Sequence, residues 1–380
     1  MEEKETKQKA KYSNHSIFVW IVVLFIAWTL GQYIFPEANG VFLENSFGIS
    51  ILAIIVGYIL FIITYEVGKI IFGNISGYRL VYTNILMFTY KKNKDNKIKF
   101  SLGKFTHFGG KTIMAPKDDK ANLTLYCLGG TIFTVFMNVL LIVVTNIIGN
   151  SVGFEEIIYF QYIMSAVSLL ILIFQIVPFL SDEIYDGFIL RICGSNKEIK
   201  KAYHQYLLQE EALLTDKDEL IYINNNDLEN PLLSRVGLYN CYYLLKNERV
   251  QEAYQEAINY LTNCQYLTEE ETGKLYSIKY YFMILEGKEE QVNEEFSALE
   301  KHIRKIIANH NNYGTIKTAL LIAVFIESSY DLYEYILGKI DKNKNKYYLS
   351  LQETEEKLID HTLNYIEKKK IDWFRAEETE

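Results

Sequence analysis

The segment that decides the fold is FGISILAIIVGYILFIITY, residues 47–65, which contains no charged side chain. About 20 apolar residues in a helix cross the hydrocarbon core of a bilayer, so this segment predicts a transmembrane helix. The chain continues as EVGKIIFG, residues 66–73. The predicted helix therefore carries a carboxylate, Glu66, and an amine, Lys69, near one end. Ionisable groups in such a position are costly and indicate a structural or functional requirement.

Three further uncharged runs have the length of a membrane span, and all lie in the first half of the 380-residue chain. We expect four transmembrane helices, at about residues 16–35, 47–72, 123–149 and 157–180. The first could instead be a signal peptide, but its apolar stretch is long and no small-residue cleavage site follows it. The expected fold is an all-α membrane protein with an N-terminal tail at residues 1–15, a membrane domain at residues 16–195 and a soluble helical domain at residues 196–380.

The positions of the lysines and arginines predict the orientation. The loop at residues 73–122 contains nine lysines and one arginine, whereas the loops at residues 36–46 and 150–156 contain neither. Basic loops stay on the cytoplasmic side. We therefore expect a multi-pass protein of the cell membrane with loop 73–122 and both termini in the cytoplasm.

The basic loop itself has the pattern of β structure. Residues 78–90 and 98–105 are rich in β-branched and aromatic side chains, and the polar run at residues 91–97 separates them. This pattern predicts a small cytoplasmic β-hairpin at the membrane surface. Its lysines could bind anionic lipid headgroups.

The residues around Glu66 share the frame of a zinc-binding helix. In the pattern H-E-x-x-H, two histidines four residues apart ligate zinc, and the glutamate deprotonates the metal-bound water. Here the frame is Y-E-x-x-K: Tyr65 and Lys69 hold the ligand positions and Glu66 holds the general-base position. A purely structural interpretation also exists, because Glu66 and Lys69 are three residues apart on a helix and can neutralise one another.

Residues 65–79, YEVGKIIFGNISGYR, resemble the H-E-x-G-H helix of the site-2 protease family, the M50 intramembrane metalloproteases. Residues 175–188, QIVPFLSDEIYDGF, are similar to that family's Asn-x-x-Pro segment, which ends in Asp-Gly. The resemblance makes Asp186 the counterpart of the third zinc ligand. Residues 128–138, LGGTIFTVFMN, resemble the glycine-bearing helix between these motifs. The supporting positions are Gly68, Gly129, Gly130, Asn138, Gln175 in place of the family's asparagine, Pro178 and Gly187.

The departures from this pattern argue against zinc chemistry. The ammonium of Lys69 has no lone pair and would repel a dication, and Tyr65 could ligate only as a phenolate. We therefore expect a protease-like protein without activity, metal or cofactor. Lys69 would lie between Glu66 and Asp186 and close the former ligand site through salt bridges. Asp186 could also be an ordinary acid at the membrane interface, as could the two acids just before it.

The second half of the chain, residues 196–380, has apolar side chains at helical spacing and should be nearly all helix. Residues 244–261, 284–303 and, more weakly, 323–340 align at a period near 40, each with a tight turn between two helices. Such units stack into solenoids. They resemble tetratricopeptide repeats and favour a surface that binds a peptide or partner protein. A plain helical bundle without a partner is the alternative.

These observations favour a catalytically inactive, site-2-protease-like membrane protein that binds a peptide, membrane segment or partner, while residues 196–380 recruit a cytosolic protein. The resemblance suggests bacterial peptide or bacteriocin maturation, export or immunity as the setting. Two alternatives stay open: an active M50-type zinc protease with non-standard ligands, and a structural anchor for a helical-repeat domain. The net charge of -8 argues against nucleic acid as a partner. The four scattered cysteines are expected to be reduced thiols.

Overall fold

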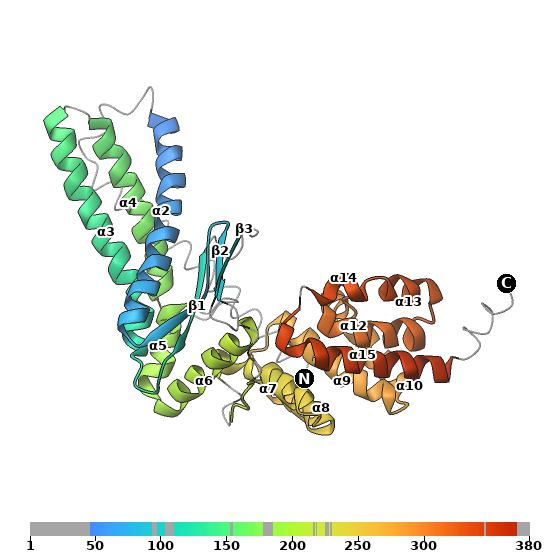
Figure 1. The fold of residues 1–380 in the computed structure, drawn as a ribbon. Coiled ribbons are helices and arrows are strands. Elements are labelled where there is room, and N and C mark those ends of the chain that lie inside the picture. Colours follow the sequence, from blue (N-terminus) through green and yellow to red (C-terminus); the bar gives the residue numbers. More distant parts are fainter. Residues whose placement is uncertain are drawn as a thin grey trace. The chain divides into compact units, whose positions relative to one another are not determined.

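The computed structural model describes residues 46–92, 97–102, 110–152, 155–177, 185–215, 217, 219–224, 228, 230–345 and 347–370. The chain divides into two compact units between Lys201 and Ala202. It is mostly helical, with one small antiparallel sheet in the first unit (Figure 1). The expected N-terminal tail, the expected first span and Pro178 lie outside the described residues.

Among the described residues of the first unit, three helices are long and apolar enough to cross a membrane, as predicted for these segments. They are α2 (Ser46–Ile75), α3 (Leu123–Val152) and α4 (Glu155–Ile176). Their apolar spans are Gly48–Ile75, Leu123–Ile148 and Ile157–Ile176. Many of their Ile, Leu, Val and Phe side chains are exposed in the isolated chain. Such a surface suits helices that are surrounded by lipid.

The three helices pack side by side, with α2 in contact with both α3 and α4 (Figure 1). Glycines permit the close approach. A Cβ atom added at Gly57 would lie 2.7 Å from the carbonyl oxygen of Met164, and one added at Gly68 would lie 2.7 Å from that of Gly129. Small residues at helix contacts are typical of helices that associate without a hydrophobic driving force.

The predicted β-hairpin is wrong in extent, because the first unit contains a four-stranded antiparallel sheet in the order β3-β2-β1-β4. Its strands are β1 (Tyr78–Ile85), β2 (Phe88–Lys92), β3 (Ile98–Leu102) and β4 (Gly110–Pro116). The run at residues 78–90, expected as one strand, is divided by a turn in which Leu86 has a φ of 58°. Leucine rarely adopts this left-handed conformation, so the local sequence carries no turn signal there.

The sheet lies along α2, and both β1 and β4 make the contact. A Cβ atom added at Gly73 would lie 2.3 Å from Sδ of Met114, and one added at Gly110 would lie 2.9 Å from Cγ of Glu66. Strand β4 therefore follows α2 from the level of Glu66 to the level of Gly73. This places the first residues of β4 beside the ionisable part of the helix.

The second unit is built of helices in the part that is described. Helix α5 (Asp186–Ser195) belongs to the first unit, and the division between the units falls within α6 (Lys197–Leu214). The remaining elements are η3 (Pro231–Leu233), α7 (Val236–Lys246), α8 (Val250–Asn263), α9 (Glu269–Leu285), α10 (Glu289–Ala298), α11 (Lys301–Ile307), α12 (Tyr313–Leu321), η4 (Ile322–Ile326), α13 (Tyr330–Leu337), α14 (Ile340–Lys344) and α15 (Leu349–Lys369). Helix α8 packs on α7 and α9, and α12 packs on α9 and α15.

Three helix-to-helix turns of this unit share one backbone feature. The turns after α7, α9 and η4 each contain a residue with positive φ: Glu248 at 57°, Gly287 at 78° and Ser328 at 48°. In the first two, the next amide reaches back five residues, Arg249 N to Leu244 O at 2.9 Å and Lys288 N to Met283 O at 3.0 Å. These bonds satisfy carbonyls that the helix end would otherwise leave open.

Candidate functional site

Two elements bring the predicted site residues together. Tyr65 and Lys69, four residues apart on α2, project from one face of the helix, and Asp186 is the first residue of α5. Gly187 permits this position, because a Cβ atom there would lie 1.9 Å from the carbonyl oxygen of Ile176 at the end of α4. The start of α5 is thus held against the end of α4, with Asp186 directed at α2.

Asp186 binds both residues at which the resemblance would place zinc-binding histidines, Tyr65 and Lys69. Nζ of Lys69 lies 3.1 Å from Oδ1 and 3.0 Å from Oδ2 of Asp186, and the hydroxyl of Tyr65 donates a hydrogen bond to Oδ2. The side chains of Lys69 and Asp186 are only 13% and 7% exposed. We call Tyr65, Lys69 and Asp186 the ion-pair cluster. Both carboxylate oxygens of Asp186 are engaged in it.

Aromatic rings complete the surroundings of the lysine. Its Nζ lies 5.7 Å from the ring centroid of Tyr65 and 5.4 Å from that of Tyr126 on α3. The Tyr126 ring stacks on Tyr78 at the start of β1, with centroids 4.6 Å apart. A cation over an aromatic face gains about 2 kcal/mol or more when it is desolvated. Sequence reasoning missed both Tyr126 and Tyr78, since no spacing relates them to the α2 motif.

Glu66 is not part of the ion-pair cluster. Its side chain is buried beside the first residues of β4, and it lies within electrostatic range of Lys69 without forming an ion pair with it. Oε2 of Glu66 accepts no hydrogen bond within the described part of the chain. Of the two salt bridges expected for Lys69, the one to Asp186 is present, whereas Glu66 attracts Lys69 only at longer range. Lys69 pairs with Asp186, and Tyr65 donates a hydrogen bond to the same carboxylate.

The glycines of the α3 motif bring that helix against the cluster. A Cβ atom at Gly129 would lie 2.5 Å from Cβ of Phe72, and one at Gly130 would lie 2.8 Å from the Tyr65 ring. Asn138 has a different role: its Nδ2 donates to Thr134 O at 2.8 Å and to Ser168 Oγ at 3.0 Å. It therefore joins α3 to α4, away from the cluster. Gln175 is half-buried near the end of α4.

A zinc ion does not fit these residues. Catalytic zinc requires about three protein ligands with free lone pairs and an open position. Lys69 offers none at neutral pH, and both oxygens of Asp186 already accept hydrogen bonds. Among the described residues, no group of three or more His, Cys, Asp or Glu side chains is arranged to hold a metal. The four cysteines are free thiols, and burial raises the pKa of Cys241.

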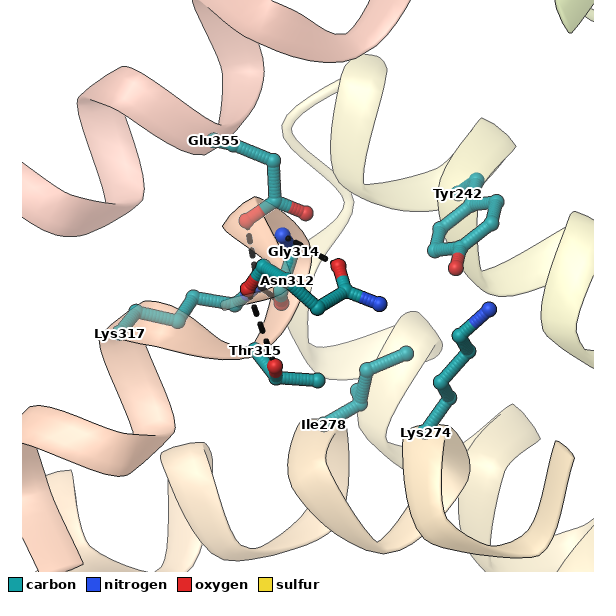
Figure 2. Close-up of a pocket in the computed structure, with 8 residues that line it drawn as sticks. All are labelled: Tyr242, Lys274, Ile278, Asn312, Gly314, Thr315, Lys317 and Glu355. Atoms are coloured by element: carbon teal, nitrogen blue, oxygen red, sulfur yellow. Dashed lines mark hydrogen bonds and ion pairs between the residues drawn. The ribbon is translucent and has the colours of Figure 1, made fainter. Parts of the chain in front are cut away.

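The second unit contains a separate buried ion pair, which Figure 2 shows at the wall of a small cavity. Lys317 on α12 pairs with Glu355 on α15, and its Nζ also donates to Gly314 O at 2.7 Å. Their side chains are 1% and 3% exposed. The cavity of about 10 Å³ has room for one water molecule. The ion pair joins α12 to α15, and the cavity leaves no space for an organic ligand.

Comparisons with known proteins add no family to this description. No family model matches the chain, and neither the curated proteins nor the solved structures gave a significant match. The resemblance to site-2 proteases therefore stays a hypothesis that depends on the motif residues alone.

Proposed function

We propose that this protein is a non-catalytic, site-2-protease-like membrane protein that binds a peptide or membrane segment. The observation that carries the proposal is the contact of Lys69 with Asp186, at two positions where the motif would place zinc ligands. The ammonium supplies a positive charge that the carboxylate would otherwise receive from a metal. It supplies no Lewis acid and no bound water, so Glu66 has no water to activate.

The surroundings of the cluster support binding better than hydrolysis. Glu66 is buried and keeps an unpaired oxygen among the described residues. An unpaired acceptor in an apolar site costs free energy unless a donor reaches it. An incoming backbone amide of a bound segment could donate to this oxygen. The occupied ligand positions would then serve to hold α2 and α5 in one arrangement.

We propose in addition that four spans cross the membrane, with both termini and the loop at residues 73–122 in the cytoplasm. The support is the distribution of basic residues and the three helices of sufficient length and apolarity. The resemblance suggests a bacterial setting in peptide maturation, export or immunity.

The helical unit is proposed to be a repeat domain that recruits a cytosolic partner. Its support is the recurrence of a positive-φ turn at Glu248, Gly287 and Ser328, which are 39 and 41 residues apart in the sequence. Equivalent turns at a constant spacing are typical of stacked helical hairpins. Extended faces of such stacks commonly bind peptides.

The experiment that tests the absence of zinc chemistry is the metal content of the full chain, purified in detergent without chelator. Less than about a tenth of an equivalent of zinc, in the wild type and in Asp186→Asn alike, is expected on coordination grounds. Near-stoichiometric zinc that disappears in Asp186→Asn would instead establish the metalloprotease alternative. Function retained in Glu66→Gln but lost on removal of the helical unit would favour a purely structural anchor.

A further inference from the structure

The outer strands of the sheet present an apolar face that no other described element covers. Every residue of β3 is exposed, with Phe100 at 75% and Leu102 at 76%. On β2, Phe88 pairs with Leu102 and is 66% exposed, and Tyr90 pairs with Phe100. We call Phe88, Phe100 and Leu102 the apolar hairpin face. Large side chains exposed in a contiguous group mark an interaction surface.

The other face of the same hairpin is basic. Successive side chains of a strand point to opposite faces of the sheet, so Lys99 and Ser101 of β3 point away from the face that carries Phe100 and Leu102. Lys99 pairs directly with Lys91 across the strands. This pairing places two ammonium groups side by side on that face. The hairpin is therefore amphipathic near the β1–β2 turn, and its charges, the Lys91–Lys99 pair and Lys92 opposite Ile98, lie toward the remote end.

The β1–β2 turn, at the end of the hairpin without charges, lies beside the membrane-capable helices α2 and α4. Leu86, in the β1–β2 turn, packs against the buried cluster of Phe61 on α2 and Leu172 on α4. Phe61 precedes the last residue of α2, Ile75, by 14 positions, which is about 21 Å along the axis, and Leu172 is about 6 Å from the end of α4. Phe88 follows this turn directly. The apolar hairpin face thus begins beside the apolar spans of α2 and α4.

From this geometry we infer that the apolar hairpin face enters the cytoplasmic leaflet of the bilayer, with Lys91 and Lys99 among anionic headgroups. The inference depends on the membrane placement proposed above. Strand β3 is an edge strand, and unpaired backbone groups are too costly in hydrocarbon. The backbone of β3 therefore stays at the depth of the glycerol and headgroups. Only the side chains of Phe100, Leu102 and Phe88 reach the acyl chains.

The test uses full-length protein in vesicles of phosphatidylcholine and phosphatidylglycerol, with an NBD fluorophore on one introduced cysteine. Cys264→Ser is the background, because the other three native cysteines are buried. The probed substitutions are Phe100→Cys and Lys99→Cys, with Val139→Cys on the exposed surface of α3 and Tyr335→Cys on α13 as controls. Lipids brominated on the acyl chains report the bilayer, and iodide reports water.

The inference predicts that brominated lipid quenches the label at position 100 about as strongly as the label at position 139. Iodide should quench it far less than the label at position 335, and the label at position 99 should respond more to iodide than its neighbour. Iodide quenching at position 100 equal to that at 335 overturns the inference, as does protection from both quenchers, which indicates cover by protein. If position 139 also escapes brominated lipid, the membrane placement itself is wrong.

Discussion

Nζ of Lys69 lies 3.0 Å from Oδ2 of Asp186, the oxygen that also accepts the hydrogen bond of Tyr65. One carboxylate thus joins a membrane-capable helix to the first residue of a helix more than a hundred residues later. Both charges are nearly inaccessible, so each depends on the other for its solvation. Substitution of one of the two residues should therefore lower the stability of the protein measurably.

Lys69→Met should destabilise the protein strongly, because it leaves Asp186 buried without a counter-charge. Removal of one partner of a buried pair costs about 3–5 kcal/mol. The double variant Lys69→Met with Asp186→Asn should recover much of the loss in detergent melting curves. The control is Lys99→Met on the exposed strand β3, which should melt like the wild type. A melting temperature of Lys69→Met equal to that of the control would mean that the ion pair does not hold the helices.

Gly68→Ala should lower the melting temperature, because the added Cβ would lie 2.6 Å from Cβ of Phe133 and 2.7 Å from the carbonyl oxygen of Gly129. Excess volume in a tight contact costs about 1–3 kcal/mol. Gly48→Ala on the same helix is the matched control, since nothing lies within 4 Å of its added Cβ. It should be neutral or slightly stabilising. Equal effects of the two substitutions would contradict the close contact of α2 with α3.

At the positive-φ turns of the helical unit, replacing a glycine and introducing a glycine should change the stability in opposite directions. Gly287 has a φ of 78° and open space around it, so Gly287→Ala should cost about 1–2 kcal/mol through the backbone alone. Ser328→Gly and Glu248→Gly, at equivalent positions, should be neutral or stabilising. Urea denaturation of the full chain, monitored in the helical unit by hydrogen exchange, measures these differences. Destabilisation by all three substitutions would argue against equivalent turns.

The Lys317–Glu355 pair predicts a pH dependence. Burial raises the pKa of the Glu355 carboxyl from its ordinary 4.5, and the nearby Lys317 opposes the shift. The folded state binds this proton more tightly than the unfolded chain does. The stabilisation of the fold by protonated Glu355 is therefore fully present below pH 4.5. It is lost as the pH rises through the folded pKa.

The measurement is the melting temperature of the wild type minus that of Glu355→Gln, across a pH series. This difference should fall as the pH rises above 4.5. A difference that increases with pH would mean that Lys317 outweighs the burial of the carboxyl and lowers its pKa.

Long uncharged runs predicted α2, α3 and α4 correctly, because about 20 apolar residues are interpretable without tertiary information. The sheet was not predictable to the same degree. The turn at Leu86 contains none of the usual turn residues, and β4 begins with Gly110 and Lys111 because it must fit against Glu66. Such constraints come from the packing partner and leave no local pattern.

The candidate site divides in the same way. Charge arguments placed Lys69 near an acid, and the Asp-Gly pattern favoured Asp186 over its neighbours. They did not indicate that Tyr65 would donate to the same carboxylate or that Glu66 would remain outside the ion pair. The position of Tyr126 beside Lys69 was not predicted either, because it depends on the close approach of α3 to α2 through Gly129 and Gly130.

If the ammonium of Lys69 takes the place of a metal, as we propose, the purified protein should contain no zinc. Full-length wild type and the variant Tyr65→His with Lys69→His would be purified without chelator, and zinc measured by mass spectrometry. We expect negligible zinc in the wild type and about one equivalent in the double histidine variant, lost again when Asp186→Asn is added. Stoichiometric zinc in the wild type that depends on Asp186 would contradict the claim.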